Sequence, residues 1–367
     1  MRKKAAVRPV MFPPGRRILV VSDVHGNLEF LRGLLKKAAF GVDDILILLG
    51  DLIEKGPDSL ATLHYVMELS QTHTVLPVAG NCDSLVVSFV DSDPDQDIRL
   101  YRHYLRHWGE RSILYQMARA AGMPPEQDED HQGLRQLVRE RYAPELAYLR
   151  EMPTILLSDR FLFVHGGVPR ENRLEELNAW DCMKCDNFRA QSHAFRRWCI
   201  VGHWPVTLYD RAIPSANPIV DRDVHIISID GGCVLKLDGQ LNALVIPDGN
   251  SEDFSNIAFD GLPTAIALDG QTPSRRSINI RWGENTVTVL RQQEELSLCR
   301  HDASGYQLKI LNSYLYRADG VIKCQDSTDY HLPVAPGDLL TVVHRTSRAT
   351  LVKKGGVTGW YFGRLAN

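Results

Sequence analysis

The stretch Ile18-Leu19-Val20-Val21-Ser22-Asp23-Val24-His25-Gly26-Asn27 places two potential metal ligands, Asp23 and His25, directly after a run of four apolar residues. A short, continuous apolar run bounded by a turn is typical of a strand that is buried on both faces. An apolar stripe at helical spacing follows the turn: Leu28, Leu31, Leu34 and Leu35. The stretch therefore predicts a strand, a polar turn and a helix, which is the repeating unit of an α/β fold.

The same pattern continues along the chain, so we expect an α/β catalytic domain over residues 17–250. The further apolar runs are 45–49, 75–78, 161–164, 199–201, 226–229 and 243–246. Between residues 95 and 152 the runs stop, and Arg, Leu, Tyr, Gln and Glu recur at helical spacing instead. This change predicts a helical cap inserted beside the sheet.

The two ends of the chain have a different character. Residues 1–16 are expected to form an N-terminal tail, and residues 251–277, rich in Gly, Pro, Asp and Ser, a linker. Short β-type segments over 278–367 predict a small all-β domain. It resembles an SH3-type bacterial module in Pro336-Gly337-Asp338-Leu339-Leu340 and in the run 358–363. Within it, Trp360 and Tyr361 form either a recognition surface or, as we favour, the core.

Composition narrows the classes of protein that this chain belongs to. The 367 residues are 44% apolar and 24% charged, with a formal charge of −3, which argues against wholesale binding of nucleic acid. No apolar run approaches the roughly 20 residues of a membrane span, and no apolar segment of a signal peptide follows the basic N-terminus. Seven scattered cysteines do not resemble a disulfide framework. We therefore expect a cytoplasmic protein without a membrane partner, of undetermined oligomeric state.

Polar clusters follow five of the predicted strands. In an open α/β sheet the carboxyl ends of the strands meet at one crevice, so these side chains are expected to converge. Six of them are potential metal ligands: Asp23, His25, Asp51, Asn81, His165 and His203. This mixture of carboxylate, imidazole and amide donors favours Mn, with Fe or Zn as alternatives.

Two neighbouring divalent cations suit the hydrolysis of a phosphate ester. They clamp the phosphate and lower the pKa of a bound water, which makes hydroxide available near neutral pH. One carboxylate must then bridge both cations, and Asp51, at the end of the second strand, is the natural candidate. The sequence therefore predicts a phosphoesterase with two divalent metal ions. Its expected substrate is a phosphoprotein, a nucleotide or a small phosphate ester.

The ordered set Asp23-x-His25-Gly26, Gly50-Asp51, Gly80-Asn81, His165-Gly166-Gly167 and Gly202-His203 resembles the calcineurin-like metallophosphoesterases. It is most similar to the branch of the serine/threonine protein phosphatases and the bacterial diadenosine tetraphosphatases. The resemblance implies a two-layer β-sandwich flanked by helices. It also implies that Asp23 and His25 bind the first metal, that Asp51 bridges, and that Asn81, His165 and His203 bind the second.

The sequence departs from this branch at two motifs. GDxxDRG is replaced by GDLIEKG at 50–56, so that Lys55 stands where the family has a phosphate-binding Arg. GNHE is replaced by Gly80-Asn81-Cys82-Asp83, so that the imidazole that protonates the leaving group is missing. Cys82 is therefore either a catalytic proton donor or a small residue packed beside the metals. Lys184 is either a second phosphate-binding cation or a solvated side chain.

These patterns lead to three hypotheses about function. The first is a phosphatase, similar to the protein phosphatases, in which metal-activated hydroxide attacks a phosphomonoester, with Asp51, Asn81, Lys55 and Cys82 as catalytic residues. The second is a phosphodiesterase or dinucleoside polyphosphate hydrolase, because a nucleotide leaves more easily than an alcohol when no imidazole donates a proton. The third is a non-catalytic, metal-binding scaffold.

Overall fold

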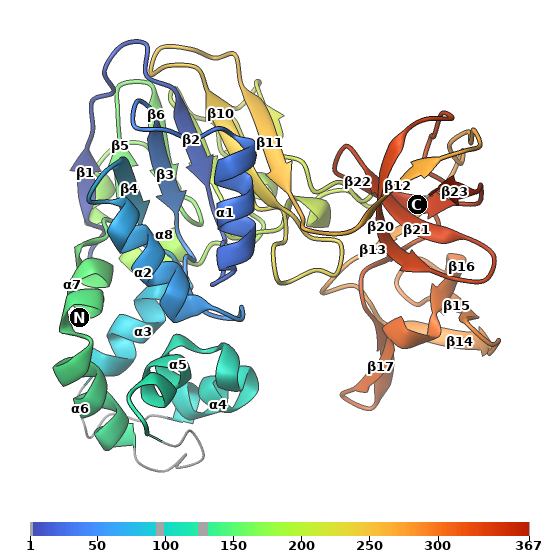
Figure 1. The fold of residues 1–367 in the computed structure, drawn as a ribbon, viewed down its shortest axis with the longest axis horizontal. Helices are drawn as coiled ribbons and strands as arrows, with labels where there is room; N and C mark the ends of the chain where they lie inside the picture. Colours follow the sequence, from blue (N-terminus) through green and yellow to red (C-terminus); the bar gives the residue numbers. More distant parts are fainter. Residues whose placement is uncertain (1–2, 93–98, 124–130, 367) are drawn as a thin grey trace. The chain divides into compact units, whose positions relative to one another are not determined.

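The computed structural model describes residues 3–92, 99–123 and 131–366 of the chain (Figure 1). It divides into two compact units. The first unit comprises Met1–Trp204, Pro218–Leu235 and Gln240–Phe259, and the second comprises Pro205–Asn217, Lys236–Gly239 and Asp260–Asn367. Each unit has its own hydrophobic core, and each is described here by itself.

A five-stranded sheet forms one layer of the first unit. Its strands, in spatial order, are β11 (Ser255–Phe259), β10 (Leu241–Ile246), β2 (Ile18–Val21), β3 (Ile45–Leu49) and β4 (Thr74–Val78). The strands β2, β3 and β4 run parallel, and β10 pairs antiparallel with β2. The three parallel strands therefore end at the same edge of the sheet.

A six-stranded sheet forms the second layer. Its strands, in spatial order, are β1 (Val7–Pro9), β5 (Ile155–Leu157), β6 (Phe161–Val164), β7 (Trp198–Val201), β9 (Ile226–Ser228) and β8 (Ile219–Asp221). The strands β6, β7 and β9 run parallel to one another. Every strand foreseen from the apolar runs in this unit is present, with ends that differ by at most two residues.

The two sheets pack face to face because each strand has apolar side chains on both of its faces. Ile18 and Val20 of β2 and Ile45 and Ile47 of β3 enter the core between the sheets, where they join Phe163 and its neighbours. The residues between them point to the other face of their sheet, where the helices cover them. The expected two-layer β-sandwich flanked by helices is thereby confirmed.

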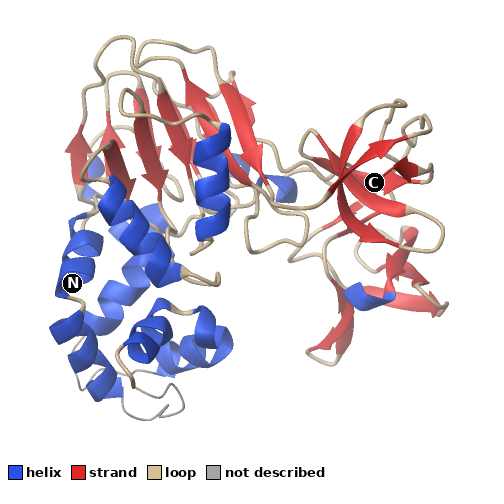
Figure 2. Cartoon of the chain, viewed as in Figure 1, coloured by secondary structure: helices blue, strands red, loops and turns tan. Residues whose placement is uncertain are grey.

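Helices cover the outer face of the five-stranded sheet (Figures 1 and 2). The first three are α1 (Leu28–Lys37), α2 (Ser59–Leu69) and α3 (Asn81–Asp91). The expected helical insertion contains α4 (Arg99–Trp108), α5 (Ile113–Ala120), α6 (His131–Arg141) and α7 (Ala143–Glu151). The insertion shares the core of α1–α3, since Ile113, Met117 and Val138 are buried in it. A short helix, α8 (Ala179–Met183), packs on the second sheet.

Two of the expected boundaries need correction. Residues 1–16 are not only a tail, because β1 pairs with β5 from Val7 to Pro9 and extends the six-stranded sheet. Residues 251–277 are not only a linker, because β11 forms the edge of the five-stranded sheet and β12 (Thr264–Ala267) belongs to the second unit. Strands β1, β11 and β12 are short, so their strand character comes from pairing with a neighbour.

The second unit is built from antiparallel strands, as expected. Its largest sheet has the order β22 (Val357–Tyr361), β21 (Thr350–Lys354), β20 (Leu339–Arg345), β12 and β23 (Leu365–Ala366). A three-stranded sheet contains β14 (Val287–Arg291), β15 (Leu296–His301) and β16 (Gln307–Leu311). Trp360 and Tyr361 are 8% and 0% exposed, so they are core residues. The likeness to an SH3-type module stays a prediction.

Among the described residues, no helix combines the length and the apolar character that crossing a membrane requires.

Candidate metal centre

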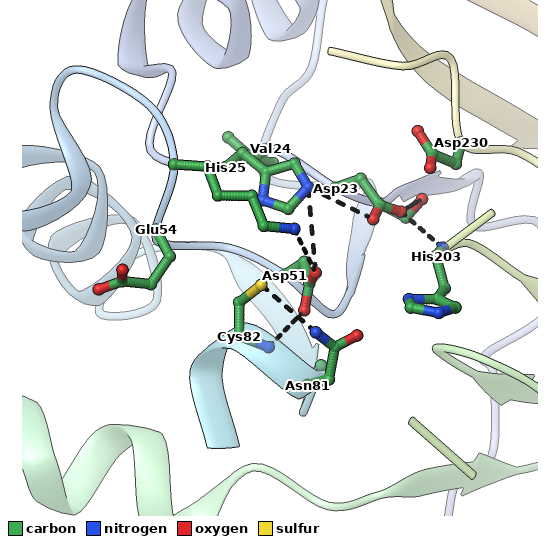
Figure 3. Close-up of polar contacts among 12 residues, drawn as sticks. Asp23, Val24, His25, Asp51, Glu54, Asn81, Cys82, His203 and Asp230 are labelled. Carbon is green, nitrogen blue, oxygen red and sulfur yellow. Dashed lines mark hydrogen bonds and ion pairs between the residues drawn. The ribbon is translucent and has the colours of Figure 1, made fainter. Parts of the chain in front are cut away.

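The six predicted ligands follow the strands whose carboxyl ends meet at one edge of the sandwich. Asp23 and His25 follow β2, and Asp51 follows β3. Asn81 is the first residue of α3, directly after the turn that leaves β4. His165 follows β6 and His203 follows β7. The two sheets therefore each contribute side chains to one site (Figure 3).

Asp51 lies at the centre of this site. Its Oδ1 is 3.3 Å from His165 Nε2, and its Oδ2 is 3.9 Å from His25 Nε2. The backbone N–H of Cys82 donates a hydrogen bond to Asp51 Oδ1 at 2.8 Å and fixes the orientation of the carboxylate. Asp23 Oδ1 lies 3.8 Å from the same nitrogen, His25 Nε2.

Two groups of donors share Asp51. Potential ligand atoms of His25, Asp51 and Cys82 lie within 4.8 Å of one another, and so do those of Asp51, His165 and His203. One carboxylate common to two clusters is the arrangement that two adjacent divalent cations require. His165 and His203 also lie edge to face, with ring centroids 5.2 Å apart.

Several donor atoms in this site are buried and have no hydrogen-bond partner among the residues that the structure describes. They are His25 Nδ1, His25 Nε2, His165 Nε2, Asn81 Oδ1 and Asp230 Oδ2. A buried polar atom without a partner costs on the order of 1–3 kcal/mol, so such atoms are rare unless they bind something. His165 Nε2 and His25 Nε2 face the Asp51 carboxylate, and these buried donors fit a pair of divalent cations.

The hydrogen bond of His165 fixes its tautomer. Nδ1 lies 2.8 Å from the carbonyl oxygen of Leu49, to which it donates. The unshared electron pair of the neutral ring is then on Nε2, the atom that faces Asp51. A backbone carbonyl that orients a metal-binding imidazole in this way is a common outer-sphere contact.

The two inner imidazoles have opposite electrostatic surroundings. Burial, with a further contribution from the Lys55 cation, lowers the pKa of His25 to about 3, so this ring is neutral. Burial also disfavours the charged form of His165, but the Asp51 and Asp23 carboxylates outweigh it and raise the pKa of His165 to about 10. A divalent cation competes with that proton for Nε2, so metal binding is expected to release it.

The backbone is strained at four of the six predicted ligands. Asp23, His25, Asp51 and His203 have φ angles of 56°, 50°, 49° and 63°. Residues other than glycine avoid this left-handed region, and holding such a residue there costs on the order of 1–3 kcal/mol. Such strain persists only where the surroundings enforce it, and here it follows buried strands that end in sharp turns.

Gly80 is required by close approach of the backbone. A Cβ atom at this position would lie 2.1 Å from the backbone nitrogen of Asp51 and 2.2 Å from its Oδ1. Only glycine therefore allows the β4–α3 turn to lie against the central carboxylate and to place Asn81 beside it.

Both predicted cations lie at the site. Lys55 Nζ is 3.9 Å from Asp51 Oδ2, and its side chain is only 17% exposed. Lys184 is not a freely solvated side chain, because its Nζ lies 3.2 Å from His203 Nε2 and forms an ion pair with Asp186. Asp186 Oδ1 is in turn 2.7 Å from His203 Nε2.

Cys82 lies inside the site, but its thiol is a weak proton donor. The residue is buried, and Asn81 Nδ2 lies 3.4 Å from its sulfur. Burial, together with the Asp51 carboxylate, raises the pKa of the Cys82 thiol well above its usual range. Its sulfur belongs to the same donor group as His25 and Asp51, so the structure adds a third possibility, that of a metal ligand.

The sequence analysis missed three acidic residues at the site. Asp83 accepts hydrogen bonds from the backbone N–H groups of Gly80, Leu52 and Ile53, at 2.9, 3.0 and 3.2 Å, and so ties two ligand-bearing turns together. Asp230 is buried beside Asp23, whose charge contributes to raising the Asp230 pKa. Asp186 pairs with His203 as described above. Asp83 and Asp230 had a visible signal, since Asp83 belongs to the Gly80-Asn81-Cys82-Asp83 motif and Asp230 directly follows the apolar run 226–229.

A family profile and several curated proteins match parts of this chain. The family profile described as calcineurin-like phosphoesterase matches residues 16–227. A symmetrical bis(5'-nucleosyl)-tetraphosphatase from Aeromonas salmonicida strain A449 is 43% identical over 72 residues, which are 19% of this chain and 26% of that protein. One from Vibrio parahaemolyticus is 27% identical over 157 residues, which are 42% of this chain and 46% of that protein. The chain thus spans less than half the length of these curated relatives.

Solved structures are similar in a more distant way. A serine/threonine phosphatase from Saccharomyces cerevisiae is 11% identical, with a TM-score of 0.41, and the match covers 71% of this chain and 85% of that chain. A metallophosphoesterase from Sphaerobacter thermophilus is 17% identical, with a TM-score of 0.37, and the match covers 67% and 89%. On the family profile, which matches more than half of its length, this chain belongs to the calcineurin-like phosphoesterase family.

Proposed function

We propose that this chain is a hydrolase of phosphoric esters or anhydrides that uses two divalent cations. The observation that supports the proposal most is the pair of donor groups that share Asp51. Asp23 and His25 would hold one cation, and Asn81, His165 and His203 the other, with Asp51 between them. Mn²⁺ is the first metal to test, and Fe or Zn are the alternatives.

When bound, two such cations supply an activated water and neutralise charge on the phosphoryl oxygens. The side chains of the chain itself then position the substrate. Lys55 is held in the site by the Asp51 carboxylate and brings a positive charge to the phosphoryl group. Lys184 is placed to do the same beside His203. Charged donors that are already in place stabilise negative charge as it develops in the transition state.

The leaving group favours a nucleotide substrate over a phosphoprotein. The structure has Cys82 where the family has an imidazole, and its raised pKa makes it a weak proton donor near neutral pH. A serine alkoxide leaves poorly without a proton, whereas a nucleoside phosphate leaves as a stable anion. The curated relatives are named as tetraphosphatases of dinucleosides, which supports the same choice. We therefore propose a dinucleoside polyphosphate as the substrate.

The test compares three substrates with the Mn²⁺-loaded protein: a dinucleoside tetraphosphate, an aryl phosphomonoester and a phosphopeptide. We expect the dinucleotide to have the highest kcat/KM. Asp51→Asn should abolish turnover of all three, because the carboxylate that both donor groups share is lost. Asp58→Asn is the matched control, since Asp58 is exposed at the start of α2 and makes no capping hydrogen bond.

Other outcomes separate the alternatives. A phosphopeptide or aryl monoester cleaved best would favour a phosphomonoesterase and refute the proposed substrate. Binding of two metal ions per chain without turnover of any of the three would favour a scaffold. Wild-type turnover by Asp51→Asn would refute the metal centre itself. The cytoplasmic location and the absence of stable nucleic-acid binding stay predictions.

A further inference from the structure

A pocket of about 570 Å³ lies in the first unit, and none of the six predicted ligands lines it. One wall is formed by α3 and the turn before it, through Ala79, Ser84, Val87 and Ser88. Another wall is formed by α8, and we name this cavity the α3–α8 pocket. Its volume is within the range of pockets that hold small organic molecules, and it exceeds what a phosphate needs.

The α3–α8 pocket borders the proposed ligands of the second metal on two sides. Ala79 is two residues before Asn81, and Ser84 lies on the same face of α3 as Asn81, three residues further along. On the other side, α8 is bonded to the turn after His165, because the backbone N–H groups of Gly166 and Gly167 donate to Cys182 O at 2.9 and 3.0 Å. The pocket is therefore bordered by the two turns that carry Asn81 and His165.

The lining of the pocket combines an aromatic surface with positive charge. Trp180 of α8 is 44% exposed, which is unusual for an indole, and the neighbouring wall residues Met152 and Met183 are apolar. Lys3 and Arg8 bring positive charge to the lining, whereas the third cation, Arg150, is paired with Asp91, and Glu151 is acidic. An aromatic face stacks on a nucleobase, and surplus positive charge suits a phosphorylated ligand.

We propose that the α3–α8 pocket binds the nucleoside of a nucleotide substrate whose phosphate is held at the Asp51 centre. This inference rests on the proposed function and adds the part of the chain that selects the substrate. A nucleoside fits the lining better than a peptide, because the exposed indole of Trp180 offers a flat surface on which a base can stack. The α3–α8 pocket offers one aromatic surface in a single cavity.

The first test measures substrate preference. The ratio of kcat/KM for diadenosine tetraphosphate to kcat/KM for p-nitrophenyl phosphate is determined for the Mn²⁺-loaded protein. In Trp180→Ala this ratio should fall about tenfold, mainly through KM, because stacking with the base is lost. Ser88→Trp, which places a large side chain in the pocket from an exposed helix position, should lower the ratio in the same way. Trp282→Ala, in the second unit, is the matched control.

The outcomes separate this inference from the proposed function. An unchanged ratio in both pocket variants would refute the nucleoside pocket while leaving the hydrolase intact. A selective loss of phosphopeptide cleavage in these variants would also refute it. If the protein hydrolyses none of these substrates, light-induced labelling with 8-azidoadenosine still tests whether the α3–α8 pocket binds a nucleoside. We expect labelled peptides from α8 or from residues 81–91, and labelling only elsewhere would overturn the proposal.

Discussion

Glu54 allows a sharp test of the electrostatics beside the metal centre. This carboxyl group is 0% exposed, and Figure 3 shows it extending away from Asp51. Its Oε1 accepts hydrogen bonds from the backbone N–H of Ile113 at 2.7 Å and from Ser112 Oγ at 3.1 Å, at the start of α5. Oε2 is buried without a hydrogen-bond partner. Glu54→Gln retains an oxygen for α5 and removes the ionisable group.

The expected effect follows from the pKa of Glu54, which burial raises from 4.5 to about 7. Above pH 4.5 the unfolded chain loses this proton while the folded chain keeps it, so the free energy of unfolding of the wild type falls as pH rises. The fall continues through pH 7 and then levels off. The difference between the folded and the unfolded pKa of Glu54 lowers the free energy of unfolding by about 3 kcal/mol at most. Glu54→Gln does not titrate, so its stability relative to wild type should rise over this range.

Differential scanning calorimetry of the metal-loaded proteins at pH 5, 6, 7 and 8 measures this difference. For a unit of this size, 3 kcal/mol corresponds to a shift in Tm of roughly 6–12 °C. Other groups titrate in both proteins and cancel in the comparison. Glu68→Gln, an exposed position on α2, is the matched control and should show a difference that is independent of pH. A difference for Glu54→Gln that stays flat from pH 5 to pH 8 would refute the reasoning.

Two further substitutions probe the site directly. Lys55→Ala should lower kcat on the order of 100-fold with a smaller change in KM, because a charge that acts mainly in the transition state is removed; steady-state kinetics measures this, and a kcat within twofold of wild type would contradict it. Gly80→Ala should lower the bound metal content, since the new Cβ would lie 2.1 Å from the Asp51 nitrogen. Metal analysis tests this against Gly41→Ala, which meets nothing within 4 Å, and equal metal content in both variants would contradict it.

The buried part of the fold was predictable because its strands have no polar face. The runs at 18–21 and 45–49 became β2 and β3 without change, and the polar residues that follow them meet at one edge. The convergence of the six ligands follows from the parallel order of strands within each layer. The position of each ligand after the end of a strand was therefore predictable from the sequence.

The edge strands were not predictable in the same way. Val7–Pro9 and Ser255–Phe259 are short and only partly buried, so their sequences carry no periodic apolar signal. They become strands because β5 and β10 offer unpaired backbone groups. The acidic partners of the predicted ligands were missed for a related reason, since a contact such as that between Asp186 and His203 depends on tertiary structure.

The change from Asp to Glu in GDLIEKG is more than a conservative substitution. A carboxylate at this position would assist the missing imidazole in the family pattern, but Glu54 turns instead to the start of α5. Glu54 and Lys55 both have left-handed φ angles, of 76° and 72°, so the loop needs an anchor to stay in this shape. The helical insertion provides that anchor, and Lys55 is thereby held against Asp51. The loss of the imidazole and the redirection of Glu54 are thus consistent with each other, because a site without a strong acid no longer needs that acid's partner.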